Sequence, residues 1–408
     1  MKKVFLTAVL IASTTGLLSL TSCVENNNDD VTTHQETFTI ENILQPKDFV
    51  QSGNFKGAGS ASVSSPLVLP GQSISFKFNA GKGQKLMFAT MYGASKDWFF
   101  APENPGLKVY NDNGTPITGD VSSQIKLWDN GSKENTTGSP ESNPIAMVPG
   151  IDASKLMKLN LDYNEASSEF TLTITNTSGG TANETPFSPG VWAVSNILLD
   201  GKLINNAPFF KAGEKSNPEI SAIAEKGEND LLTTKIKNNT GIITGVSPVL
   251  VVVYQGNTNP IYTVNAKDMG LGLKYIAQKG DATKLKAALT KPGVSVYLVG
   301  NGPIEPGDKA SANITTKPGD KIAYVTMFGY SNDWFFANES EIKATEYGNL
   351  TSKTAIFDDG TAFNQYPGAG NKQALFGGDS DPEDKNITKL GTEYPIPAIS
   401  SILKITYQ

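Results

Sequence analysis

The sequence predicts a mainly β protein in which one β-rich module is used twice. The first observation is an internal repeat, because Asp97-Trp98-Phe99-Phe100 recurs as Asp333-Trp334-Phe335-Phe336 and the flanking residues match as well. The second is composition, since abundant Gly, Pro, Asn, Thr and Ser suit short strands joined by turns. The third is length, because 408 residues exceed one ordinary domain.

Alternating apolar residues predict strands in both halves of the chain. Ile74, Phe76 and Phe78 alternate with polar residues early in the chain, and its last residues follow the same pattern. Residues 85–91 form a mostly apolar run that predicts a buried central strand, and residues 322–327 match it.

Two related segments, 188–232 and 247–289, each predict a strand followed by short helices, and we name them the head segments. Residues 223–227 (Ile-Ala-Glu-Lys-Gly) match residues 276–280 (Ile-Ala-Gln-Lys-Gly), and we expect the final glycine of each to end one short helix before another begins. Asn217 suits a helix N-cap, and Pro218 suits the first helical position. Both head segments follow residue 181, so we expect the head to be duplicated within the second half.

Residues 1–22 are typical of a secretory signal peptide, with two lysines before an apolar stretch. The four residues ending at Cys23 resemble the lipobox of bacterial lipoproteins, which implies cleavage before Cys23 and lipid on its thiol. The alternative is an ordinary signal with a spare cysteine. We expect a polar, flexible tether over 23–36 and an outer-membrane lipoprotein at the cell surface or the periplasmic face.

Composition limits the chemistry that the folded part could perform. The single cysteine excludes a disulfide within the chain, and the single histidine, His34, falls in the tether, so a Ser-His-Asp unit cannot form. The net charge of −6 argues against nucleic-acid binding. We therefore expect a protein that is not an enzyme, with a hydrolase using paired carboxylates left open by the 40 acidic residues.

Several motifs, in the same order, resemble the spondin N-terminal domain family and particularly its bacterial members. They are residues 188–194 (Ser-Pro-Gly-Val-Trp-Ala-Val), residues 272–281 and the two Asp-Trp-Phe-Phe segments. The resemblance covers most of residues 36–408 and implies C2-like antiparallel β-sandwiches. We expect one such domain over 37–177 and another over 182–408, the second with short inserted helices and the duplicated head.

The resemblance also implies a calcium site in each copy, formed by the aspartate before the tryptophan and by the aspartate that opens an Asp-x-Gly loop. A third ligand of the family, a glutamate, has no counterpart at 76–78 or 312–314, and Lys77 would be unfavourable beside a cation. An asparagine in each loop could add a carbonyl oxygen. The candidate metal ligands are Asp97, Asp129, Asn135, Asp333, Asp358 and Asn364. The second copy is the more favourable site, because Asp358-Asp359 adds charge and its matching strand has no lysine at 312–314. The alternative is that each aspartate caps a turn by accepting backbone N–H groups.

The aromatic residues after each aspartate are candidates for ligand binding. They are Trp98, Phe99, Trp334 and Phe335. Side chains alternate along a strand, so they cannot all point inward if the segment is extended. An exposed ring could stack on a sugar or contact a partner, and the alternative is that these rings pack at the end of a sandwich.

The function expected from the sequence is a lipid-anchored cell-envelope binding or adhesion protein, with calcium as the candidate cofactor. Its partners would be the membrane, through the lipid, and an extracellular protein or glycan. The alternative is a carbohydrate-binding or nutrient-capture surface lipoprotein that uses the aromatic loops.

Overall fold

The computed structural model describes residues 32–59 and 66–408. The predicted signal peptide, Cys23 and most of the predicted tether lie outside the described residues. The chain divides into Met1–Thr32 and Thr33–Gln408, and the second unit contains the elements below. None of the helices within the described ranges has the length and apolarity that crossing a bilayer requires.

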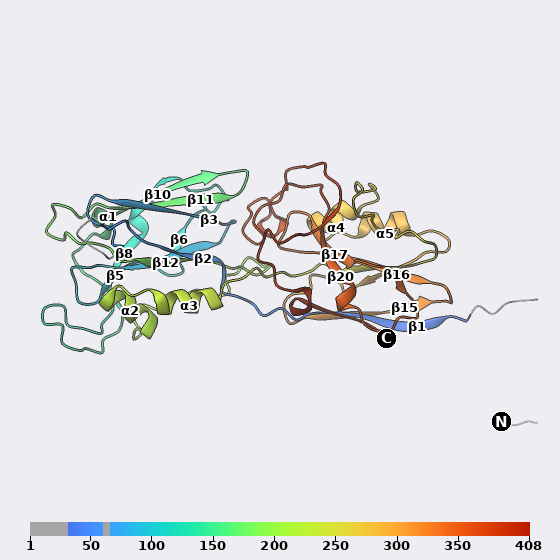
Figure 1. Cartoon of the computed structure of the whole chain (residues 1–408), viewed down its shortest axis with the longest axis horizontal. Helices are drawn as coiled ribbons and strands as arrows, with labels where there is room; N and C mark the ends of the chain where they lie inside the picture. The colour runs from blue at the N-terminus through green and yellow to red at the C-terminus, as the bar shows by residue number, and fades with distance from the viewer. Residues whose placement is uncertain (1–31, 60–65) are drawn as a thin grey trace, which may run out of the picture. The chain divides into compact units, whose positions relative to one another are not determined.

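Thr33–Gln408 folds into two antiparallel β-sandwiches with a few short helices, which confirms the predicted fold class (Figure 1). In the first sandwich, the larger sheet has the strand order β2-β12-β4-β5-β8-β9, with β6 beside β4, and the smaller sheet has the order β3-β11-β10-β7. The bounds of these strands are β2 (Phe49–Phe55), β3 (Ser73–Asn79), β4 (Lys85–Met91), β5 (Trp98–Pro102), β6 (Leu107–Lys108), β7 (Gly119–Asp120), β8 (Ile125–Asp129), β9 (Ala146–Met147), β10 (Met157–Asn164), β11 (Glu169–Asn176) and β12 (Gly190–Ser195).

The second sandwich repeats this arrangement. Its larger sheet has the order β14-β13-β16-β17-β20-β21, with β18 beside β16, and its smaller sheet has the order β15-β1-β22-β19. The bounds of these strands are β1 (His34–Asn42), β13 (Val249–Tyr254), β14 (Ser295–Val299), β15 (Lys309–Thr316), β16 (Lys321–Met327), β17 (Trp334–Asn338), β18 (Ile342–Lys343), β19 (Gly348–Asn349), β20 (Thr354–Asp358), β21 (Thr388–Lys389) and β22 (Leu403–Tyr407).

An asparagine cap and two glycines set helix ends in the head segments. The α-helices of the described residues are α1 (Ala153–Leu156), which lies outside the heads, and α2 (Pro218–Lys226), α3 (Asp230–Asn238), α4 (Leu273–Lys279) and α5 (Thr283–Leu289). The Asn217 side chain accepts a hydrogen bond from Ile220 N at 2.9 Å and caps α2. Helices α2 and α4 both end at a glycine in the left-handed conformation, with φ of +68° at Gly227 and +70° at Gly280.

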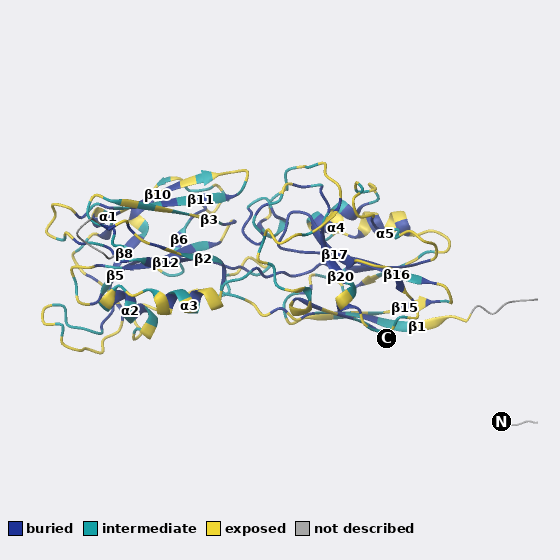
Figure 2. Ribbon diagram, viewed as in Figure 1, coloured by how far each residue is buried: buried dark blue, intermediate teal, exposed yellow. Residues whose placement is uncertain are grey.

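Each larger sheet is buried on both faces. One face packs on the smaller sheet of its sandwich, and the helices of a head segment cover the other. Every residue of β13 and of β17 is therefore buried, and Figure 2 shows the region of β17 in dark blue. The smaller sheets keep one face in water, so β10 and β11 alternate between buried and more exposed residues.

The sheet pairing differs from the predicted division at residues 177 and 182. Strand β1 pairs with β15 and β22, so residues 34–42 belong to the second sandwich. Strand β12 pairs with β2 and β4, so the first head segment belongs to the first sandwich. Each sandwich thus has one head, and the first sandwich lies in sequence between β1 and β13 of the second.

Two asparagines show that β1 and β11 occupy the same place in the two sandwiches. Asn42 Nδ2 donates to Thr244 O at 2.9 Å and to Ile304 O at 3.1 Å. Asn176 Nδ2 donates in the same way to two backbone carbonyls of the first sandwich, at 2.9 and 2.7 Å. The two sandwiches therefore share one architecture with a different order of strands along the chain.

Candidate functional site

The paired strands at the far end of each larger sheet bring the predicted aspartates together. In the first sandwich β5 pairs with β8, and Trp98 lies opposite Asp129. In the second, β17 pairs with β20, and Trp334 lies opposite Asp358. We name the resulting sites the first aspartate loop (Asp97 with residues 129–135) and the second aspartate loop (Asp333 with residues 358–364).

In the first aspartate loop, Asp97 is fully buried and organises the turn that follows β8. Its Oδ2 accepts hydrogen bonds from Lys133 N at 2.8 Å and from Ser132 N and Oγ at 2.9 and 3.1 Å. Asp129 Oδ1 accepts from Gly131 N at 2.7 Å, and its Oδ2 accepts from Asn135 Nδ2 at 2.9 Å. Burial, with the nearby charge of Asp129, raises the pKa of Asp97 despite these bonds.

The second aspartate loop repeats these bonds around Asp333, which is also fully buried. Its Oδ2 accepts from Thr361 N at 2.7 Å and from Ala362 N at 2.8 Å, while Asp358 accepts from Gly360 N at 2.8 Å and from Asn364 Nδ2 at 2.5 Å. Burial, followed by the charge of Asp358, raises the pKa of Asp333 to about 7. Burial also raises the pKa of Asp358.

A third side chain in each loop, Asn130 in the first and Asp359 in the second, lies outside the six candidate ligands, although the sequence favoured the second copy for the charge that Asp358-Asp359 adds. Both are fully buried. The Asn130 amide donates to Ser132 Oγ at 2.7 Å and to Ser221 Oγ at 3.1 Å. Asp359 Oδ2 accepts from Thr361 Oγ1 at 3.0 Å, and burial, followed by the charge of Asp268, raises its pKa to about 8. The only available signal was the aligned Asp-Asn-Gly and Asp-Asp-Gly sequences.

Three buried oxygens in each loop lack a hydrogen-bond partner among the described residues. These atoms lie at three matched positions, and they are six of the eleven buried side-chain nitrogen and oxygen atoms that lack a partner in the described part of the chain. They are the Oδ1 atoms of Asp97, Asn130, Asn135, Asp333, Asp359 and Asn364. Buried polar atoms are normally satisfied, so the recurrence at matched positions requires an explanation.

The aspartates do cap turns, as the alternative predicted, but that role uses only part of each side chain. Backbone N–H groups satisfy Oδ2 of Asp97 and Oδ2 of Asp333, whereas the Oδ1 atoms receive nothing from the described residues. An oxygen-rich group of this kind fits a hard cation such as Ca²⁺. In the described ranges no three His, Cys, Asp or Glu side chains are grouped to hold a metal, so amide, hydroxyl or backbone oxygens would have to complete the shell.

The structure removes the objection that Lys77 would repel a cation. Lys77 lies on β3 in the smaller sheet, and its Nζ is 2.7 Å from Glu169 Oε1 on β11. Asp97 lies before β5, in a different sheet. The charge of Lys77 is therefore already paired within its own sheet.

Three of the four candidate binding aromatics cannot present a ring to a ligand. Phe99, Trp334 and Phe335 are 0% exposed, and only Trp98 is half-buried. Trp334 packs into the core between the two sheets, whereas Phe335 packs under the helices of the second head. Both faces of the larger sheet are covered, so the expectation that some of these rings would be exposed was wrong for Phe99, Trp334 and Phe335.

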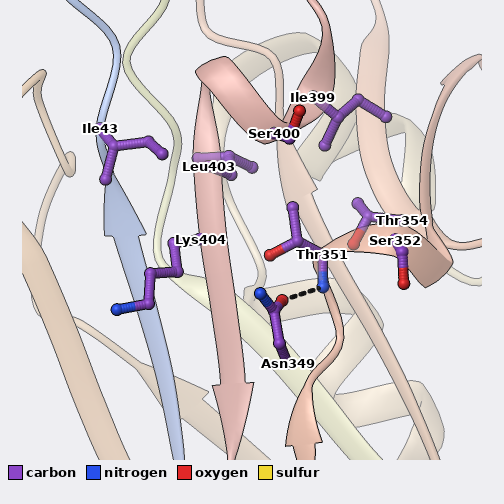
Figure 3. Close-up of a pocket in the computed structure, with 9 residues that line it drawn as sticks. All are labelled: Ile43, Asn349, Thr351, Ser352, Thr354, Ile399, Ser400, Leu403 and Lys404. Atoms are coloured by element: carbon purple, nitrogen blue, oxygen red, sulfur yellow. Dashed lines mark hydrogen bonds between the residues drawn. The ribbon is translucent and has the colours of Figure 1, made fainter.

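A surface cavity of about 610 Å³ lies elsewhere in the second sandwich (Figure 3). Its lining holds hydroxyl and aliphatic side chains with one lysine, Lys404, and no carboxylate. The one hydrogen bond drawn among these residues joins Asn349 Oδ1 to Thr351 N at 2.8 Å. The cavity shares no residue with either aspartate loop, so the aspartate loops remain the candidate site.

No family model matches this chain, and no curated protein matches it.

Proposed function

We propose that this protein is a non-enzymatic binding or adhesion protein of the bacterial cell envelope, anchored by lipid on Cys23, with a Ca²⁺ site at each aspartate loop. Its two sandwiches would present the calcium-stabilised loops to an extracellular protein or glycan. Ca²⁺ would fix the loops at the ends of β5, β8, β17 and β20 in the conformation that a partner recognises.

One observation carries the calcium part of this proposal. Each loop buries an aspartate Oδ1 and an asparagine Oδ1 that lack a partner among the described residues, and a third such oxygen comes from Asn130 in the first loop and from Asp359 in the second. A buried carboxylate without compensation is costly, and a cation would offset that cost. Ca²⁺ accepts about six to eight oxygen ligands and tolerates a mixture of carboxylate, carbonyl and water.

Thermal unfolding of the full chain in calcium and in chelator tests the proposal. We expect calcium to raise the unfolding midpoint of the parent protein, because a ligand that binds only the folded state stabilises it. Asp97→Asn combined with Asp333→Asn should abolish the shift, whereas Asp112→Asn, at a side chain that is 94% exposed, should leave it intact. An unchanged midpoint of the parent protein in excess calcium would remove calcium from the proposal.

The anchor is tested separately, by fractionating cells that express the parent chain or Cys23→Ala. The parent should sediment with the outer membrane, and the variant should be soluble after signal cleavage. Recovery of Cys23→Ala in the membrane fraction would refute lipid anchoring at this residue.

A further inference from the structure

The two aspartate loops share a hydrogen-bonding scaffold but differ in charge. At the position where the first loop has Asn130, the second has Asp359, and both side chains are fully buried. Asn130 satisfies two hydroxyl oxygens with its amide. Asp359 has no N–H to donate, so the second loop has two fully buried carboxylates, Asp333 and Asp359, where the first has one, Asp97.

Internal donors also neutralise the first loop more completely. Asp129 Oδ2 accepts a hydrogen bond from the Trp98 indole N–H at 3.0 Å in addition to the bond from Asn135. In the second loop, the indole Nε1 of Trp334 has no partner among the described residues, and Asp358 Oδ2 is bonded by Asn364. The second loop therefore leaves more carboxylate charge without a donor.

The charged side chains around the two loops also make the surroundings of the second loop the more negative. In the first loop, Lys133 lies next to Ser132, and its Nζ is 2.7 Å from Glu225 Oε2. Although burial opposes ionisation, bonds from Lys133 and Ser132 hold the pKa of Glu225 below its usual value. The first loop thus contains its own lysine, and because an acid on the covering helix α2 pairs with it, the pair as a whole is neutral.

The matching positions of the second loop carry no charge. Ala362 replaces the lysine, and Gln278 on α4 replaces the glutamate and donates to Thr361 Oγ1 at 3.0 Å. The other charged groups that face the second loop are Asp268, Glu383 and Lys385, and Lys385 Nζ is 2.7 Å from Glu383 Oε1. That pair is neutral as a whole, so Asp268 adds one more negative charge.

We infer that the two aspartate loops are unequal cation sites, and that the second loop binds Ca²⁺ tightly while the first binds it weakly. The inference rests on the proposed calcium function and adds the residue that separates the two sites, Asp359. Calcium affinity follows the number of ligand charges and the rigidity of the site. The negative charge of Asp359 raises the affinity whether its oxygens join the shell directly or act from beside it.

Calorimetric titration of the full chain with Ca²⁺ alone tests this inference. We expect one tight site and a second site at least tenfold weaker. Asp359→Asn, which installs the residue of the first loop, should weaken the tight site at least tenfold. Asn130→Asp, which installs the residue of the second loop, should strengthen the weak site, and a gain of affinity cannot result from misfolding.

The outcomes separate this inference from the proposed function. Two sites of equal affinity in the parent chain would overturn the inference and leave the calcium proposal standing. A tight site that survives Asp333→Asn but is lost in Asp97→Asn would also overturn it. No heat and no thermal shift with Ca²⁺ at either loop would refute both. Unfolding in chelator should show that Asp359→Asn remains folded, because asparagine has nearly the same shape as aspartate.

Discussion

Asp333→Asn should change stability with opposite signs in chelator and in calcium. Burial raises the pKa of Asp333 from its ordinary value of 3.8 to about 7. Each pKa unit corresponds to about 1.4 kcal/mol, so holding the ionised carboxylate in the fold costs about 4 kcal/mol above pH 7. The unfolded chain ionises earlier than the folded chain, so this cost develops as the pH rises from about 4 to about 7 and is absent below that range.

The variant keeps an oxygen that can accept the N–H groups of Thr361 and Ala362 but carries no charge. In chelator at pH 8, we therefore expect Asp333→Asn to be more stable than the parent by up to about 4 kcal/mol. Calcium restores the parent, because a free concentration of a thousand times Kd adds about 4.1 kcal/mol. The two proteins should then be about equally stable, and the parent should be more stable above that concentration.

Urea unfolding at pH 8, followed by tryptophan fluorescence in chelator and in calcium, measures both differences. Asp112→Asn is the control, because its exposed carboxylate should give no difference in either condition. A variant that is less stable than the parent in chelator would refute the reasoning. It would mean that Asp333 is a satisfied turn cap whose charge the fold already compensates.

Three further predictions test the packing and the electrostatics. Trp334→Ala should lower the free energy of unfolding, measured by urea denaturation, by about 3–5 kcal/mol, because the Trp334 ring is fully buried. Trp98→Ala should lower it by less, because the Trp98 ring is only half-buried. Asn42→Ala leaves two buried backbone carbonyls without their donor and should cost about 2–4 kcal/mol, whereas Asn313→Ala on an exposed position should change the urea midpoint little. Burial raises the pKa of Glu305 above its ordinary value of 4.5, so the parent should lose stability as the pH rises above about 4.5. Glu305→Gln should reduce this loss, which is measured as the difference between the urea midpoints at pH 4 and pH 8.

The sequence predicted the local features well because local chemistry determines them. The repeated Asp-Trp-Phe-Phe segments predicted two related modules, and alternation predicted strands such as β3 and β22. Asn217 and Gly227 predicted the ends of α2, because capping needs a side-chain acceptor at the start and a left-handed residue at the end. The meeting of Asp97 with Asp129, expected from the family resemblance, depends on the pairing of two neighbouring strands.

The sequence could not assign each segment to its sandwich. A repeat shows which segments are alike, but a strand's partner depends on tertiary contacts, so β1 and the first head segment were assigned to the opposite sandwiches. The aromatic residues were misjudged for a related reason. Alternation predicts an exposed face only where a sheet has one, and the helices of each head cover the outer face of the larger sheet.

The two sandwiches order their strands differently along the chain, yet both build an aspartate loop. The elements that build the loop can therefore be distinguished from the side chains that determine its charge. Both loops form the same bonds although the head precedes the loop in one sandwich and follows it in the other. The pairing of two strands and a covering helix therefore suffices to build the loop, and chain order does not matter. The charge, by contrast, depends on a few side chains in residues 129–135 and 358–364.

It follows that the Ca²⁺ affinity of the second aspartate loop should be transferable to the first by substituting loop residues, without any change in the fold. Replacing residues 130–135 with the sequence of 359–364, together with Glu225→Gln on the covering helix, removes Lys133 and Glu134 and installs a second buried carboxylate at position 130. We expect this graft to bind two Ca²⁺ ions of similar affinity in a calorimetric titration, because backbone N–H groups hold the grafted residues as they do in the second loop. A graft that folds and still binds one tight ion would show that the backbone around β5 and β8, rather than the charge of the loop, limits the first site.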